Sequence, residues 1–229
     1  MSEFFFSTRF FKRLPSSEND IKQQLDTLKK IINKIVVIDS SFSTWYINNS
    51  VDTKPPLDYP FPSEKSDNYL LKIRKKDEFQ SFSLWNGADN SNFVGINFDT
   101  FDFRMNFEKV LECDQIIKLF IVMLDHIKFQ YIYLNSDFFS DINIFPHRLE
   151  TTSICYVPKI IDENQIPYLY KKIEINNELN KGTILIFDQN WFAESAFMKK
   201  KIQKNSIALV DLGLIPEAEL DSDFFNIES

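Results

Sequence analysis

The side chains that could carry out acid–base or metal chemistry are few and widely spaced in this chain. Its two histidines are His126, inside a predicted helix, and His147, in a predicted loop. We interpret His126 as packed against the core by its helix and His147 as solvated. Neither belongs to an H-x-x-x-H or H-E-x-x-H motif, and Cys113 and Cys155 lack the spacing of zinc ligands. The sequence therefore contains no indication of a zinc site.

Two carboxylates, Asp99 and Asp102, form an Asp-x-x-Asp motif. A pair of converging carboxylates can hold a divalent metal or share acid–base catalysis. On an extended strand this spacing directs the side chains to opposite faces, so the pair meets only if the chain turns between them. We interpret both as solvated carboxylates of a turn, and Asp137 and Asp141 as exposed near a short helix. A metal-dependent enzyme that uses Asp99 and Asp102 is the alternative.

Glycine is scarce, with four residues in the whole chain. Loops that cradle phosphate groups need glycine because backbone N–H groups must approach the ligand closely. The sequence contains no G-x-G-x-x-G, no G-x-x-x-x-G-K and no G-x-S-x-G motif. We therefore expect no nucleotide-binding loop of these kinds, no nucleophile elbow, no cofactor and no enzymatic activity.

Composition and charge narrow the class of partner. The chain has 229 residues and a formal net charge of −7, with a pI of about 5.0, which argues against binding to nucleic acid or to an anionic membrane. The N-terminus shows no signal-peptide pattern, and the apolar runs are far shorter than a membrane span. Two well-separated cysteines fit a reducing compartment. We expect a cytoplasmic protein that is monomeric or weakly homo-oligomeric when free, and the negative charge fits either a soluble protein or one whose partner is basic.

Hydrophobic periodicity and turn residues predict strands and helices along the whole chain. Ser17 and Asp20 can form a capping box for a helix over 18–34 that has one apolar stripe. The clearest core helix is expected over 114–129. Other helices are expected at 64–75, 136–143 and 190–203, and strands at 3–12, 79–85, 92–98, 101–108, 130–134, 152–157, 169–175, 183–187 and 206–210.

This pattern predicts an α+β fold, a single domain over residues 1–229 in which a few amphipathic helices pack on an antiparallel sheet. A division into two subdomains near residue 110 is the alternative. Residues 51–63 contain Pro55, Pro56, Pro60 and Pro62 and are expected to form an extended connection. The acidic C-terminal segment 217–229 is expected to fray.

Two tryptophan segments are the most distinctive feature of the sequence. The first ends in Asp39-Ser40-Ser41-Phe42-Ser43-Thr44-Trp45-Tyr46 after a predicted helix, and the second is Leu84-Trp85-Asn86-Gly87. A large ring directly after an amphipathic helix most often closes the core, so we expect the first aromatic group to be buried. Leu84 and Trp85 cannot face the same side of a strand. We expect the one that points away from the core to meet a second internal layer.

In order and spacing, these segments resemble the immunity protein 52 family of bacterial polymorphic toxin systems. The resemblance is clearest from Leu25 to Asn97, weaker through the helix at 114–129, and poor in the C-terminal half. Similar proteins usually have a small residue soon after the Trp-Tyr pair. Here Asn48-Asn49-Ser50 takes that place, and a turn is still possible because Asn tolerates the left-handed conformation. The residues that carry the resemblance are Asp39, Phe42, Trp45, Tyr46, Trp85, Asn86 and Gly87, followed by Val94-Gly95-Ile96.

The resemblance implies a non-enzymatic antitoxin that binds and neutralises a protein toxin made by the same cell. Such toxins carry a restriction-endonuclease-like nuclease domain and are often delivered by type VI secretion. The family pattern is structural and implies no contact residues. From the sequence itself we expect acidic loop residues to face the toxin, and our candidates are Asp89, Asp99 and Asp102. A structural adaptor without a toxin is the third hypothesis.

Overall fold

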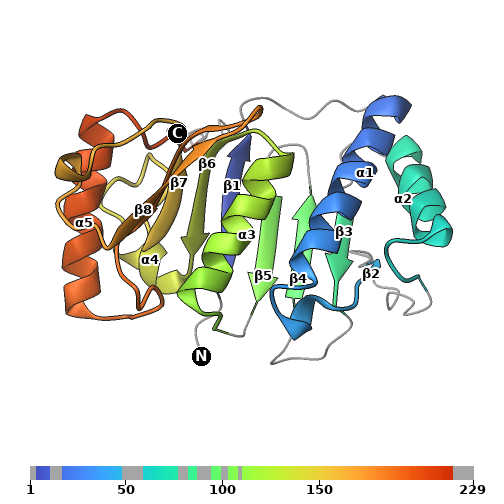
Figure 1. Cartoon of the computed structure of the whole chain (residues 1–229), viewed down its shortest axis with the longest axis horizontal. Helices are drawn as coiled ribbons and strands as arrows, with labels where there is room; N and C mark the ends of the chain where they lie inside the picture. The colour runs from blue at the N-terminus through green and yellow to red at the C-terminus, as the bar shows by residue number, and fades with distance from the viewer. Residues whose placement is uncertain are drawn as a thin grey trace, which may run out of the picture.

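The computed structural model describes residues 4–10, 17–47, 59–76, 82–86, 94–98, 103–107 and 110–218. Within this part of the chain, nine strands form one antiparallel sheet, and helices pack against it (Figure 1). Across the sheet the order is β2-β3-β4-β5-β1-β6-β7-β9-β8. The strands are β1 (Phe4–Phe10), β2 (Tyr46–Ile47), β3 (Phe82–Trp85), β4 (Val94–Phe98), β5 (Phe103–Phe107), β6 (Phe129–Asn135), β7 (Ile154–Val157), β8 (Lys171–Asn176) and β9 (Lys181–Ile186).

The N-terminal strand β1 joins the two halves of the sheet. It pairs with β5 on one side, where Phe4 stands opposite Phe107, and with β6 on the other, where Thr8 stands opposite Ile132. Strands from before and after residue 110 therefore belong to one sheet. The predicted α+β fold with an antiparallel sheet is confirmed.

The helix that follows β1 begins where its capping signal predicts. The Asp20 N–H group donates to Ser17 Oγ at 3.3 Å, and the Ser17 N–H group donates to the Asp20 carboxylate at 3.2 Å. The apolar stripe of this helix is buried, from Ile21 through Leu28 to Ile35. The helices are α1 (Glu18–Ile35), α2 (Glu64–Lys76), α3 (Cys113–His126), α4 (Asp137–Asp141) and α5 (Ala196–Asp211), with short 3-10 helices η1 (Ser40–Phe42) and η3 (Glu163–Gln165).

The predicted helix at 190–203 and strand at 206–210 are wrong as separate elements, because one helix, α5, covers Ala196–Asp211. Ser195 caps its start by accepting a hydrogen bond from the Met198 N–H group at 3.1 Å. The β-branched residues near its end suggest a strand when read locally. Burial at helical spacing decides otherwise, since Met198, Ile202, Asn205, Ser206 and Leu209 all face the core.

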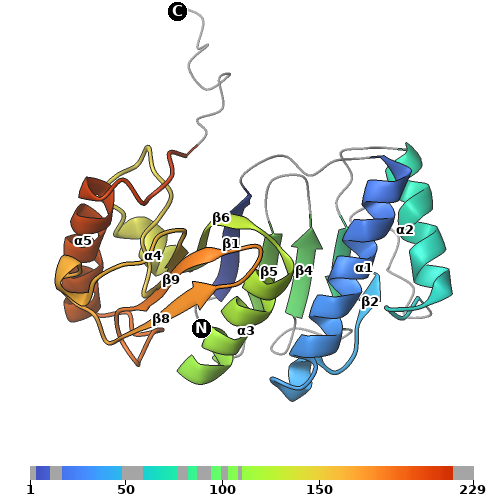
Figure 2. The ribbon, with the colours of Figure 1, turned by 45° about the horizontal axis from the view of Figure 1, so that its top comes forward.

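The helices cover the two faces of the sheet unequally. Both views show α1 and α3 on the same face (Figures 1 and 2). The four successive residues Tyr131–Leu134 of β6 are all buried, so this strand is covered on both faces. The Tyr131 hydroxyl donates to the Glu150 carbonyl oxygen at 3.0 Å, and Thr151 hydrogen-bonds to Ser206 of α5 at 3.1 Å. The segment before β7 and helix α5 therefore cover the second face at this half of the sheet.

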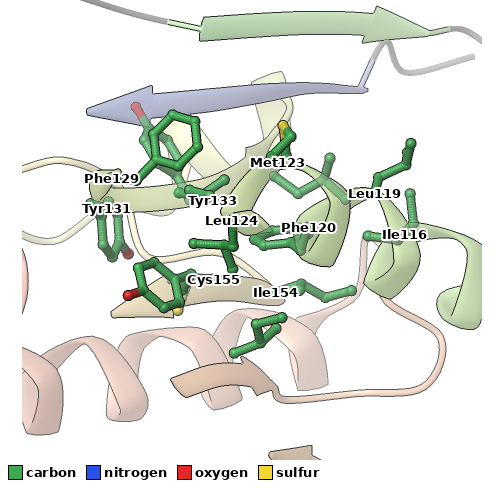
Figure 3. Close-up of a cluster of buried hydrophobic side chains, with 14 of the residues drawn as sticks. Ile116, Leu119, Phe120, Met123, Leu124, Phe129, Tyr131, Tyr133, Ile154 and Cys155 are labelled. Carbon is green, nitrogen blue, oxygen red and sulfur yellow. The ribbon is translucent and has the colours of Figure 1, made fainter. Parts of the chain in front are cut away.

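The centre of the core lies between α3 and the strands that follow it. Figure 3 shows apolar side chains of α3 next to those of β6 and β7. α3 ends at His126, earlier than expected, and β6 begins at Phe129. The α3 residues that are fully buried are Ile116, Leu119, Phe120, Met123 and Leu124.

The start of the C-terminal segment is held in place, contrary to our expectation that it frays from residue 217. Arg148 and Glu217 form an isolated antiparallel bridge and an ion pair at 3.7 Å. The Ala218 N–H group donates to the His147 carbonyl oxygen at 3.0 Å. The described chain ends with Ala218, so the remainder of the predicted tail lies outside it.

Candidate partner-binding surface

The turn between α1 and β2 is held by the first residue of the tryptophan motif. The Asp39 carboxylate caps η1 by accepting hydrogen bonds from the Ser41 N–H group at 2.9 Å and the Ser41 hydroxyl at 2.8 Å. Gln115, in the first turn of α3, donates to the Ile38 carbonyl oxygen at 2.9 Å and to Asp39 Oδ2 at 3.3 Å. Asp39 therefore connects the end of α1 to the start of α3.

Trp45 is part of the core, as predicted. Its side chain is 3% exposed, and Phe42 beside it is fully buried. The two rings stack with centroids 6.3 Å apart and planes 9° apart. The indole N–H group donates to the Phe42 carbonyl oxygen at 2.8 Å, so the one polar atom of the ring is satisfied inside the protein.

Asn86 joins the two tryptophan segments. Its side-chain amide donates to the Ser41 carbonyl oxygen at 3.1 Å, and its own carbonyl oxygen accepts from the Thr44 hydroxyl at 3.1 Å. Asn86 is buried. These bonds hold the end of β3 against the turn that precedes β2, so this part of the motif is structural.

Tyr46 and Trp85 differ from the other motif residues. They stand directly opposite each other in the β2–β3 pair, and Ile47 stands opposite Leu84. Residues opposite each other on antiparallel strands lie on the same face, and neighbours along a strand lie on opposite faces. Ile47 and Leu84 are buried, whereas Tyr46 and Trp85 are partly exposed. The expectation that Tyr46 lies in the core is wrong, because β2 turns this residue to the other side of the sheet.

We call the side of the sheet that carries Tyr46 and Trp85 the Tyr46–Trp85 face. We expected a second internal layer over the outward residue of β3. In the described part of the chain, no helix lies over this face at β2, β3, β4 and β5 (Figures 1 and 2). Two large aromatic side chains therefore lie side by side, each partly exposed, on the face that the described helices do not cover.

The three carboxylates that we expected to face a toxin, Asp89, Asp99 and Asp102, lie outside the described residues, as does Gly87. The strands around them still define where their loops begin. Asp89 belongs to the connection from β3 to β4, and the other two belong to the connection from β4 to β5. Antiparallel pairing makes these connections leave opposite ends of β4, which are about 13 Å apart. The loop with Asp89 begins next to the Tyr46–Trp85 face.

The histidines and cysteines lie elsewhere. His126 ends α3, and burial, followed by the nearby positive charge of Lys34, lowers its pKa. Both thiols are free. Burial raises the pKa of Cys155 to about 12, and burial together with Asp114 raises the pKa of Cys113. A raised pKa disfavours the reactive thiolate, so neither cysteine is an activated nucleophile.

The structure also shows an apolar hollow of about 390 Å³ between α1 and α3. Val37, just beyond the end of α1, is 84% exposed at its rim. Lys34 and Lys118 contribute positive charge to the same hollow. This hollow was not predicted from the sequence, although Val37 and Ile38 continue the apolar residues past the predicted end of the helix.

Asn180 has a structural role that was not predicted from the sequence. In the turn between β8 and β9, its side-chain amide donates to the Leu124 and Ile127 carbonyl oxygens at 2.6 Å and 2.7 Å. Its side-chain oxygen accepts from the Phe129 N–H group at 3.1 Å. Asn180 thus satisfies backbone groups at the end of α3 and the start of β6, a long-range role that no local pattern reveals.

Among the residues that the structure describes, no three His, Cys, Asp or Glu side chains gather where they could hold a metal ion. In the same part of the chain, no helix combines the length and apolar character needed to cross a membrane. Neither the models of known protein families nor the curated proteins include a match to this chain.

Proposed function

We propose that this chain is an immunity protein that binds and neutralises a protein toxin with a restriction-endonuclease-like nuclease domain, of the kind delivered by type VI secretion. One observation carries the proposal. Among the residues that resemble the immunity protein 52 family, most hold the β2–β3 end of the sheet together, but Tyr46 and Trp85 are left partly exposed on one face. Two large aromatic side chains side by side on a partly exposed face are typical of a protein-binding surface.

The chemistry of the Tyr46–Trp85 face suits a protein partner. Tyr and Trp are enriched at interface hot spots because each offers a large apolar ring with one polar atom and few rotatable bonds. The Tyr46–Trp85 pair sits on a strand pair that Asn86 ties to Ser41, so the rings are held in place before binding. Such preorganisation reduces the entropy that association costs.

The charge of the chain suits a basic partner. Its net charge is −7, and the loop with Asp89 begins beside Trp85. A nuclease surface that binds nucleic acid is positively charged. The carboxylate of Asp89, in the connection that follows β3, would accelerate the encounter with such a surface. A cytoplasmic location, where an incoming nuclease meets nucleic acid, is part of this proposal.

The proposal is tested with a nuclease-domain toxin encoded beside this chain. Co-expression should restore the growth of cells that produce the toxin. The purified proteins should bind with a Kd on the order of 1 nM, about −12 kcal/mol. The Tyr46→Ala/Trp85→Ala double variant should remain folded and bind at least about 100-fold more weakly, because hot-spot residues each contribute about 2 kcal/mol or more.

A matched control removes an exposed aromatic residue at the opposite end of the sheet. Tyr170, just before β8, is 52% exposed, and Tyr170→Ala should bind like wild type. If the double variant keeps wild-type affinity while the toxin is neutralised, the Tyr46–Trp85 face is not the docking surface. Failure of the wild-type chain to rescue growth or to bind the toxin would reject the antitoxin proposal itself.

A further inference from the structure

The two edges of the sheet differ in how their backbone groups are used. At the β2 edge, the Ile47 N–H group donates to the Tyr59 carbonyl oxygen at 3.1 Å, and the Phe61 N–H group donates to the Trp45 carbonyl oxygen at 2.8 Å. Pro60 between them cannot donate a hydrogen bond. This edge is therefore closed to the addition of a further strand. The other edge is β8, which ends the strand order.

Hydrogen bonding shows which groups of β8 point outward. The Asn177 N–H group donates to the Asn180 carbonyl oxygen at 3.0 Å, which continues the β8–β9 register by one residue. Hydrogen-bonded and non-hydrogen-bonded pairs alternate along an antiparallel ladder. Counting back from Asn177, the backbone groups of residues 171, 173 and 175 bond to β9. Those of residues 172, 174 and 176 point to the outer edge, where no described segment of the chain bonds to them.

The side chains on β8 form a self-complementary pattern. Lys172 and Glu174 lie on the same face and form an ion pair at 3.2 Å. When two copies of β8 run antiparallel about a two-fold axis at Ile173, Lys172 of each copy stands opposite Glu174 of the other. A shift by two residues in either direction would place Glu174 opposite Glu174, or Lys172 opposite Lys172. Like charges directly opposite each other destabilise a pair, so charge selects the first register.

We propose that β8 is a self-association edge, on which a second copy of this chain adds its own β8 and extends the sheet through a two-fold axis at Ile173. In this register the outward backbone groups of residues 172 and 174 in both copies bond to each other, which agrees with the alternation described above. β2 and β8 are opposite ends of the sheet, so the dimer leaves the Tyr46–Trp85 face open. The strand pair buries less than a stable interface of about 1,200 Å², and the dimer is therefore weak and concentration-dependent.

Charge reversal tests the register directly. Lys172→Glu alone and Glu174→Lys alone should each lower the dimerisation constant at least about tenfold, as measured by sedimentation equilibrium. In either variant the two-fold axis places two pairs of like charges at positions 172 and 174 opposite each other. A mixture of the two single variants should form a heterodimer as strong as the wild-type dimer, since every facing pair is then opposite in charge. Lys181→Glu, on the neighbouring strand β9, is the matched control and should leave dimerisation unchanged.

A disulfide tests the position of the axis. Opposite residues of a non-hydrogen-bonded antiparallel pair have Cα atoms about 4.5 Å apart, within the range that a disulfide spans. In a Cys113→Ser background, Ile173→Cys should therefore form a covalent dimer on mild oxidation. Ile175→Cys, which would face Lys171 of the second copy, should not.

Three outcomes would overturn the proposal. The first is a wild-type chain that stays monomeric up to about 1 mM, where association worth only about 4 kcal/mol would still be seen. The second is a mixture of the charge variants that associates no better than each variant alone. The third is cross-linking that is equal for Ile173→Cys and Ile175→Cys. The proposal does not rest on the antitoxin function, because none of these measurements involves a toxin.

Discussion

Gly182 on β9 lies directly against Tyr156 on β7. A β-carbon at position 182 would come within 2.7 Å of the Tyr156 hydroxyl oxygen and within 2.2 Å of the Val157 carbonyl oxygen. The Tyr156 hydroxyl is buried and has no hydrogen-bond partner among the described residues, and burial raises the pKa of Tyr156 to about 12. Because Gly182 has no side chain, the ring of Tyr156 can pack directly against its backbone.

Gly182→Ala should lower the free energy of unfolding by about 3 kcal/mol or more, because the carbonyl oxygen belongs to the backbone and a strand must move to admit the methyl group. Urea unfolding followed by circular dichroism measures the change. Gly213→Ala is the matched control. It meets no atom within 4 Å but has φ at +69°, so its cost should be about 1 kcal/mol. Equal effects of the two substitutions would contradict the close packing at Gly182.

Trp45→Ala should lower the free energy of unfolding by about 3–5 kcal/mol, because it removes a buried ring that stacks on Phe42. Trp45→Phe keeps part of the ring and should cost less. Thermal and urea unfolding provide the comparison. The folded fraction of each variant should still bind the toxin, because Trp45 lies inside the core. A variant that melts like wild type but loses the toxin would instead make Trp45 a contact residue.

Stability should depend on pH through His126. Its pKa is lowered in the folded state, so the unfolded chain binds more protons near the ordinary histidine value of about 6.5. This contribution is present above pH of about 6.5 and is lost as the pH falls toward the lower folded value. Wild type should therefore lose more stability than His126→Gln between about pH 7.5 and pH 5.

Reversal of Asp89, Asp99 and Asp102 to Lys should slow association with the toxin several-fold at low salt, if these loops attract a basic surface. Stopped-flow kinetics at several salt concentrations measures the effect. It should shrink as salt increases, because the Debye length is about 10 Å at 0.1 M.

The control for this charge change reverses exposed carboxylates at the other half of the sheet, Asp137, Asp141 and Glu163. It alters the net charge by the same amount but should change the association rate less. Equal slowing by both triple variants would show that net charge, rather than these loops, governs the encounter.

Much of the fold follows from local patterns. The capping box at Ser17 and the apolar stripe from Ile21 to Ile35 identify α1, because caps and helical neighbours act within one turn. Local patterns fail at the end of α5. There the β-branched residues from Ile207 to Val210 favour a strand, but burial of Asn205, Ser206 and Leu209 against the core selects the helix.

At the candidate surface, too, local patterns predict some features and the tertiary structure decides the others. The alternation of a strand determines that Leu84 and Trp85 face opposite sides, and an apolar helix before Trp45 indicates that its ring is buried. The sequence alone does not determine which face of β3 the helices cover, nor that Tyr46 shares a face with Trp85. The pairing of β2 with β3 and the Asn86–Ser41 hydrogen bond across 45 positions decide both. Contacts between segments so distant in the chain form only when the whole sheet assembles, and no local propensity encodes them.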